Sequence, residues 1–199
     1  MKIVSDQLLT SSEVGELLQV NPSSVKKWVD DGLLLAFRTP GGHRRIRAAD
    51  LVTFLVHHSM PIPADVQDAA MKRLLIVDDE VDQLKALARS LKRFADRVDV
   101  TTTSNGIDAL VLVGSFQPHV VLLDVYMPGI DGLEVCRRLK KNPATKDVQV
   151  YVVSGSFTSA LEQKALEAGA AKCLPKPIDV RNVINLMYPP REGFMEARA

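Results

Sequence analysis

The chain has 199 residues, of which 46% are hydrophobic and 25% charged, and its formal net charge is +1. This composition excludes a disordered chain and a uniformly basic coat for nucleic acid. The longest apolar runs are too short to cross a bilayer, and the N-terminus lacks the apolar core of a signal peptide, so we expect a cytoplasmic protein. Cys136 and Cys173 stand among apolar residues without a metal-binding spacing, which predicts buried, inert thiols.

Two prolines in close succession, Pro61 and Pro63, mark a boundary within the chain. Proline cannot continue a helix and favours an extended path. Patterns typical of short helices precede the boundary, and strands that alternate with helices follow it. We therefore predict a first domain over residues 1–58, a linker over 59–71, a second domain over 72–188 and a C-terminal tail over 189–199.

Three segments of the first domain carry apolar residues at the i, i+3, i+4 spacing of one helical face. Thr10 with Glu13 three residues later is the signature of a capping box for the first helix. Asn21 and Pro22 begin the second helix, and Gly32 suits the left-handed position that ends it. Only a short turn separates these two helices, as a helix-turn-helix requires. The apolar triplets are Val14/Leu17/Leu18, Val25/Trp28/Val29 and Leu51/Phe54/Leu55.

A hairpin with a basic returning strand follows the second helix. Residues 33–38 and 43–47 have strand character, and the Thr-Pro-Gly-Gly sequence of residues 39–42 supplies the turn between them. Residues 22–47 contain six Lys or Arg and two Asp, a local excess of four positive charges. Neutralisation of phosphates drives DNA affinity, so this excess predicts a DNA-binding surface.

The first domain resembles the MerR/excisionase-type winged helix-turn-helix. The resemblance rests on residues 10–14, 25–28, 32–34 and the Gly-Gly-His-Arg-Arg wing at 41–45. In that family the second helix enters the major groove and wing arginines hold the flanking backbone. The resemblance implies phosphate contacts from the lysines and arginines and base contacts from the serines. The implied DNA-binding residues are Ser23, Ser24, Lys26, Lys27, Arg38, His43, Arg44 and Arg45.

Ordinary structural roles compete with these assignments. Trp28 lies on an apolar stripe, which favours a core position over base stacking. Lys26 and Lys27 alone would be typical of a solvated face, and only the basic wing beside them favours DNA contact. His57 and His58 point in different directions on a helix, which favours surface positions over a metal site. No heptad pattern follows the domain, so the paired dimer of MerR-type proteins is not implied.

Residues 72–188 alternate short apolar strands with amphipathic helices. The strands show little polar alternation, which is typical of a parallel sheet buried on both faces. Five strands alternating with five helices predict a doubly wound, flavodoxin-like (βα)5 domain of the α/β class. The predicted strands are Leu74 to Val77, Val98 to Thr101, Val120 to Leu123, Val148 to Val153 and Cys173 to Leu174.

Polar residues follow four of these five strands. Ligands bind beyond the carboxyl ends of the strands in such sheets. Three carboxylates gathered there would repel one another unless a cation shared the site, and carboxylate oxygens suit Mg²⁺. A lysine and a hydroxyl beside them would meet the oxygens of a phosphoryl group, and a carboxylate can accept that group. The residues are Asp78, Asp79, Asp124, Ser154 and Lys176.

This constellation resembles the receiver domain of two-component response regulators. The resemblance also includes Met127-Pro128-Gly129, Asp131-Gly132 and Lys176-Pro177, and it spans the whole second domain. It implies that Asp124 accepts phosphate from a phosphohistidine. It further implies that Asp78, Asp79, Asp124 and the Tyr126 carbonyl hold Mg²⁺, while Ser154 and Lys176 stabilise the phosphoryl group.

Two competing interpretations and one departure from the family bear on this assignment. The aspartates would merely cap helices and turns in one interpretation, and would hold Mg²⁺ without phosphorylation in the other. Receivers usually carry an aromatic residue or histidine three positions before the lysine, whereas this chain has Cys173. We expect Ser154 and Cys173 to form the switch, with altered coupling because a thiol is small.

Together the resemblances imply a two-component response regulator, most simply a regulator of transcription. A sensor histidine kinase or phosphotransfer protein would phosphorylate Asp124, and the added charge would change binding of double-stranded DNA or self-association. We expect no membrane partner and no enzymatic activity beyond phosphorylation and dephosphorylation of the aspartate. A DNA-architectural, excisionase-like accessory factor and a phosphorelay or protein-binding adaptor are the alternatives.

Overall fold

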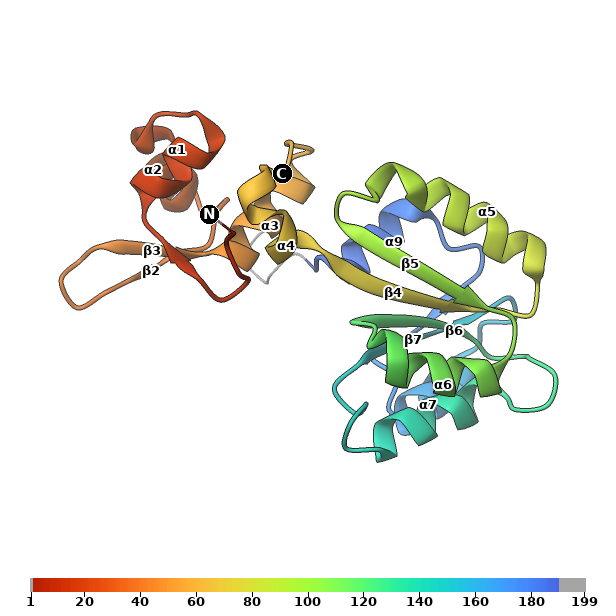
Figure 1. Ribbon diagram of the computed structural model, residues 1–199. Helices are drawn as coiled ribbons and strands as arrows, with labels where there is room; N and C mark the ends of the chain where they lie inside the picture. The colour runs from red at the N-terminus through yellow and green to blue at the C-terminus, as the bar shows by residue number, and fades with distance from the viewer. Residues whose placement is uncertain (1, 190–199) are drawn as a thin grey trace. The chain divides into compact units, whose positions relative to one another are not determined.

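The computed structural model describes residues 2–189, and this part of the chain divides into two compact units. The first unit contains the residues up to Met71 together with Tyr188, and the second contains Lys72–Met187. Each unit has its own sheet and its own helices (Figure 1). The chain passes between the units twice, at Met71–Lys72 and at Met187–Tyr188.

The first unit contains the predicted helix-turn-helix. Helix α1 follows Thr10, and the capping box is confirmed because Thr10 and Glu13 each bond the backbone N–H of the other. The Asn21 side chain caps α2 by accepting from the N–H of Ser23 at 2.9 Å. Gly32 has the predicted left-handed conformation, with φ of 72°. The helices are α1 Ser11–Leu18, α2 Pro22–Asp30 and α3 Ala48–His57.

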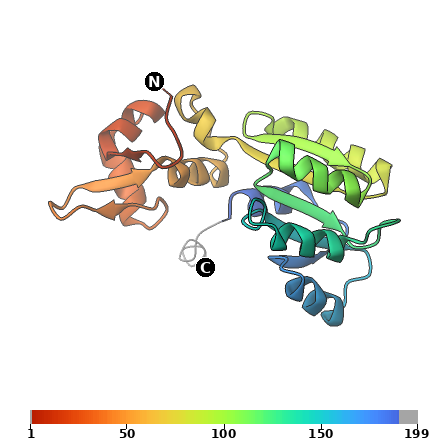
Figure 2. The same cartoon turned by 60° about the horizontal axis from the view of Figure 1, so that its bottom comes forward.

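The hairpin after α2 forms a wing of a small antiparallel sheet. Strand β2 (Phe37–Arg38) pairs with β3 (Arg44–Arg47), and the two strands project as a narrow loop from the helices of this unit (Figures 1 and 2). Strand β1 (Leu8–Leu9) pairs with the other edge of β3, giving the order β1-β3-β2. The sequence pattern predicts strand character over residues 33–38, whereas β2 contains only Phe37–Arg38 and residues 33–36 lie outside it.

The apolar stripes of α1, α2 and α3 contribute to the core of the first unit. Val14, Val25 and Leu51 are fully buried. Trp28 is half-buried and packs on the Phe54 ring with centroids 5.0 Å apart, in agreement with its predicted core role.

The predicted linker over residues 59–71 differs from the observed structure. It contains a short 3₁₀ helix, η1 Ala64–Val66, and a one-turn helix, α4 Gln67–Ala70. Pro63 precedes η1, where its fixed φ favours the start of a helix rather than its interruption. Val66 and Ala70 are fully buried, so burial of apolar surface orders this segment.

The second unit is a parallel five-stranded sheet with the strand order β5-β4-β6-β7-β8. This order reverses at β4, as in doubly wound folds of the flavodoxin type, and confirms the predicted fold class. The central strand β6 is buried along its whole length. The strands are β4 Lys72–Val77, β5 Val98–Thr103, β6 Val120–Asp124, β7 Gln149–Ser154 and β8 Lys172–Pro175.

Helices cover both faces of this sheet. Helices α5 and α9 lie on one face, and α6 and α7 lie on the other (Figure 1). The core between the sheet and α6, α7 and α8 contains both cysteines, which confirms their predicted burial. The helices are α5 Val81–Leu91, η2 Lys92–Phe94, α6 Gly106–Phe116, α7 Gly132–Lys141, α8 Ser159–Glu167 and α9 Val180–Met187. Among the described residues, no helix has both the length and the apolar character that a membrane crossing requires.

Candidate functional site

Three aspartates meet at the carboxyl edge of the second unit's sheet. Asp78 and Asp79 directly follow β4, and Asp124 is the last residue of β6, the strand beside it. One carboxylate oxygen of each residue lies within 4.8 Å of one from each of the others. Asp78 and Asp124 are buried, and Asp79 is more open to solvent. The sheet therefore brings together the carboxylates that the sequence placed at two strand ends.

Lys176 reaches this cluster from the loop after β8. Its Nζ lies 2.7 Å from Oδ2 of Asp78 and 3.2 Å from Oδ2 of Asp124. It also approaches Oε1 of Glu80 at 3.8 Å. The lysine side chain is largely buried, so water screens these attractions less than on an open surface.

The charges at the site shift the pKa values of its groups. Burial raises the pKa of Asp124; the positive charge of Lys176 opposes this rise, and the negative charge of Asp78 adds to it. Burial lowers the pKa of Lys176, but Asp78 and Asp124 together outweigh burial and raise it above the ordinary value. The lysine therefore remains an ammonium ion, and the pKa of the neighbouring Asp124 lies above its ordinary value.

The donor set at this edge fits a divalent cation. Three carboxylates carry more negative charge than one ammonium group can neutralise. A cation would offset the remaining negative charge. All of the available donors are oxygens, the ligands that Mg²⁺ prefers.

Ser154 ends β7, the strand next to β6, and is fully buried. The register pairs Asp124 with Val153, so Ser154 stands one residue further along at the same edge of the sheet. Its hydroxyl oxygen accepts from the N–H of Ser156 at 3.1 Å. A hydroxyl donor is thus available beside the carboxylates.

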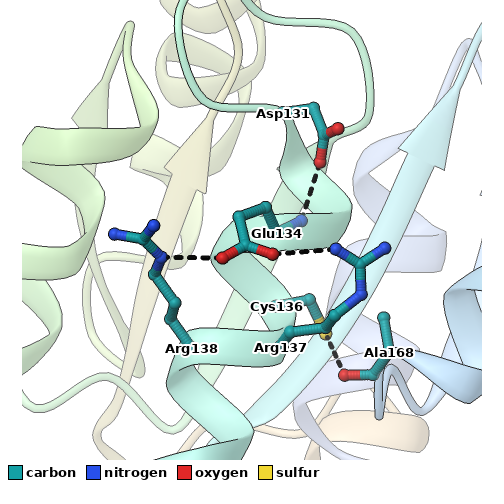
Figure 3. Close-up of polar contacts among 6 residues, drawn as sticks. All are labelled: Asp131, Glu134, Cys136, Arg137, Arg138 and Ala168. Carbon is teal, nitrogen blue, oxygen red and sulfur yellow. Dashed lines mark hydrogen bonds and ion pairs between the residues drawn. The ribbon is translucent and has the colours of Figure 1, made fainter.

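The loop after Asp124 is fixed by the start of α7. The Asp131 carboxylate accepts from the N–H of Glu134 at 2.7 Å, and Glu134 in turn pairs with Arg137 and Arg138 at 2.9 Å each (Figure 3). Gly132 lies so close to the backbone of Asp124 that a Cβ there would be 2.0 Å from the Asp124 carbonyl oxygen. The Asp-Gly pair thereby anchors the strand end that carries Asp124.

Tyr126 and Cys173 lie in contrasting environments. Tyr126, whose carbonyl we predict as a cation ligand, has 62% of its surface exposed. Cys173 is buried in β8 beside Val152, and burial raises the pKa of its thiol.

The acidic site continues into a cleft of about 660 Å³ that runs between α5 and the loop from Lys176 to Asp179.

The first unit presents a basic face on α2. Lys26 and Lys27 are exposed, as is Ser23, whereas Ser24 is half-buried. The Ser23 hydroxyl donates to the Asn21 carboxamide oxygen at 2.8 Å, so it also takes part in the helix cap.

The four predicted wing residues differ in their surroundings. Arg38 and His43 are exposed, and Arg38 makes a 3.4 Å hydrogen bond to the carbonyl of Gly42. Arg45 is half-buried and donates to the carbonyl of Arg44 at 3.0 Å. Arg44 is also half-buried, and its guanidinium pairs with Asp30 at 2.5 Å.

Two residues near these sites escaped the sequence analysis. Glu80 approaches Lys176, and the signal for it was the third consecutive acid after Asp78 and Asp79. Asp30 holds Arg44 across 14 positions of sequence, and no spacing rule connects residues so far apart.

Comparison with known families matches residues 74–188 to the response regulator receiver domain. The chain belongs to the response regulator receiver family. Residues 8–56 match a helix-turn-helix domain, so the receiver follows a second recognised domain. The two matches confirm the fusion that the sequence motifs indicated.

Curated relatives of the receiver are named as response regulators. Response regulator PleD of Caulobacter vibrioides is 37% identical over 107 residues, which cover 54% of this chain and 23% of that protein. Response regulator MprA of Mycobacterium sp. strain KMS is 35% identical over 115 residues, which cover 58% of this chain and 48% of that protein. The chain thus spans less than half the length of these relatives.

Solved receiver structures share the fold. The receiver domain of a DNA-binding response regulator (merR) from Colwellia psychrerythraea 34H is 28% identical, with a TM-score of 0.55 over 58% of this chain and 94% of that one. A Burkholderia pseudomallei response regulator, described with a phosphorylated aspartic acid, calcium ion and citrate, is 26% identical with a TM-score of 0.53. That match covers 58% of this chain and 66% of the other.

Proposed function

We propose that this protein is a response regulator in which phosphorylation of Asp124 controls DNA binding by the helix-turn-helix unit, and thereby transcription. The observation that carries the proposal is the contact of Lys176 with Asp124 and Asp78 inside a cluster of three carboxylates. Positioned charges of this kind are what phosphoryl transfer chiefly requires.

Asp124 is the acceptor in this proposal. Its carboxylate oxygen attacks the phosphorus of a phosphohistidine on a sensor kinase or phosphotransfer protein, an O–P bond forms, and the N–P bond breaks. Lys176 and the hydroxyl of Ser154 then hold the phosphoryl oxygens. The relative from Burkholderia, described with a phosphorylated aspartic acid, supports this assignment. We expect no further enzymatic chemistry beyond slow hydrolysis of the aspartyl phosphate.

Asp78, Asp79, Asp124 and the backbone carbonyl of Tyr126 would hold Mg²⁺. When bound, the ion neutralises part of the charge on the phosphoryl group. The side chain of Glu80 lies within reach of Lys176, and we expect it to tune the charge at the site rather than to bind the ion.

Phosphorylation adds about −1.5 to −2 charges beside Lys176. This lysine would then exchange its contact with Asp78 for the phosphoryl group, which displaces the loop between β8 and α9. We propose that this displacement alters DNA binding or self-association of the chain. Because Cys173 replaces a larger aromatic residue of the family, we expect Ser154 and the Lys176 loop to carry most of the movement.

The proposal is tested by phosphorylation and DNA binding of the full chain. Acetyl phosphate with Mg²⁺ should add the mass of one phosphoryl group, and Asp124→Asn should add none. Beryllofluoride, a mimic of phosphate, should change the affinity for a short duplex that the unmodified chain selects from random DNA. An unchanged mass would overturn the acceptor assignment, and an unchanged affinity and oligomeric state would overturn the switch.

A further inference from the structure

We propose that Arg44 positions the wing on α2 through Asp30 and does not itself bind DNA. This inference rests on the proposed DNA binding of the first unit and changes one of its predicted contacts. Arg44 is therefore a positioning residue, and the DNA backbone is left to the exposed basic side chains.

The ion pair connects the two elements that a winged helix-turn-helix presents to DNA. Asp30 is the last residue of α2, and Arg44 is the first residue of β3, the returning strand of the wing. Nη2 of Arg44 donates to Oδ1 of Asp30 at 2.5 Å. Arg44 lies opposite Arg38 in the hairpin register, so a shift of Arg44 also shifts the outer strand.

Burial separates Arg44 from the exposed basic residues of this surface. Only 20% of its side chain is exposed, and its Nε is buried without a hydrogen-bond partner among the described residues. In contrast, Lys26, Lys27 and Arg38 are exposed. To reach a phosphate, the Arg44 guanidinium would have to leave both its packed position and its carboxylate partner.

Asp30 should lower the affinity of this surface for DNA, because a carboxylate repels phosphate. Residues 22–47 contain only two acids, Asp30 and Asp31, and Asp30 is the one that pairs with the wing. The positioning role explains why a negative charge stands at the end of the basic helix. The positioning role also predicts that removal of the Asp30 charge weakens DNA binding, whereas removal of a negative charge would ordinarily strengthen it.

The decisive experiment compares Asp30→Asn with Asp31→Asn in the full chain. Removal of either charge should strengthen binding to the selected duplex if only long-range electrostatics matters. If Asp30 holds the wing, Asp30→Asn should instead weaken binding about fivefold, the effect of losing a partly exposed ion pair. Asp31 has no side-chain partner among the described residues, so Asp31→Asn should leave binding unchanged or tighter. Equal or tighter binding by Asp30→Asn would overturn the proposal.

The salt dependence of binding distinguishes positioning from contact. Each phosphate contact contributes about −0.9 to the slope of log K against log salt concentration. Arg44→Met should weaken binding without changing this slope, whereas Lys26→Met should make the slope shallower by about 0.9. A slope change of the same size for Arg44→Met would show that Arg44 contacts a phosphate.

A charge-exchange double variant tests whether the single variants lose DNA binding through loss of the ion pair or through loss of folding. Asp30→Arg combined with Arg44→Asp restores opposite charges at the same two positions, and it should bind more tightly than Arg44→Asp alone. No rescue in a double variant whose far-ultraviolet spectrum is unchanged would count against the pair. If the unmodified chain selects no duplex at all, the proposed function fails instead, and the two outcomes are thereby separated.

Discussion

Gly132 lies against the backbone of Asp124, the proposed phosphoryl acceptor. An alanine Cβ would lie 2.0 Å from the Asp124 carbonyl oxygen, which only backbone movement could relieve. We expect Gly132→Ala to lower the free energy of unfolding by about 2–3 kcal/mol, the usual cost of overpacking. Urea denaturation followed by circular dichroism measures this loss.

Gly114 is a matched control for this substitution. It lies inside α6, has no neighbouring atom within 4 Å of its added Cβ, and faces solvent. Gly114→Ala should raise stability by about 0.5–1 kcal/mol, because alanine restricts the unfolded chain more than glycine. A similar loss from both substitutions would contradict the proposed role of Gly132.

Cys136 is expected to be unreactive at neutral pH. Burial raises the pKa of its thiol to about 11, and the Sγ–H donates to the carbonyl of Ala168 (Figure 3). The raised value means that roughly one thiol in a thousand is ionised at pH 8, and only the thiolate is nucleophilic. Iodoacetamide at pH 8 should therefore modify neither Cys136 nor the buried Cys173 until the chain is unfolded. Fast modification of the folded chain would contradict this prediction.

The residues of the acidic site could be predicted because strand ends are visible in sequence. Asp78, Asp124 and Lys176 each follow an apolar run, and a parallel sheet gathers such ends at one edge. The pairing of Arg44 with Asp30 could not be predicted, because it depends on how the wing folds back onto α2.

At the scale of elements, the capping box of α1 is the most local determinant of the helix-turn-helix. Thr10→Ala removes the oxygen that accepts from the N–H of Glu13 and should destabilise the first unit by about 1 kcal/mol. Trp28 is the only tryptophan of the chain and lies in this unit, so its fluorescence during urea denaturation measures the effect. Ser12→Ala, at an exposed position of the same helix, should have little effect.

Elements with their own capping or periodic signals were predicted well, and elements that depend on a partner were not. The helices α1, α2 and α3 carry their signals in adjacent residues. Strand β1 contains only Leu8–Leu9 and exists because β3 offers it an edge. Residues 64–70 became helical through burial of Val66 and Ala70, which the two nearby prolines obscured.

At the scale of the whole molecule, the first unit is completed by a residue from the far end of the chain. Tyr188 is 1% exposed, and its hydroxyl donates to the carbonyl of Ala70. Its own carbonyl accepts from the ring of His57, the last residue of α3. The sequence pattern predicts Tyr188 as the last residue of the second domain, and the match to the receiver family also ends at this residue.

Tyr188→Phe should therefore destabilise the first unit. The substitution leaves the buried Ala70 carbonyl without this donor, which costs about 1–2 kcal/mol. The urea midpoint from Trp28 fluorescence should fall, while Tyr151→Phe, in the second unit, should leave that midpoint unchanged. Equal midpoints for Tyr188→Phe and the unmodified chain would show that the Tyr188 hydroxyl contributes nothing to this unit.

The position of Tyr188 limits how the first unit can be separated from the rest of the chain. Cutting between Met71 and Lys72 does not release a complete helix-turn-helix unit, because the excised piece lacks a side chain from its own interior. A chimaera that joins the first unit to another receiver domain should therefore also carry Tyr188, supplied from a segment that follows that domain. Transplantation of the first 71 residues alone would deliver a weakened fold.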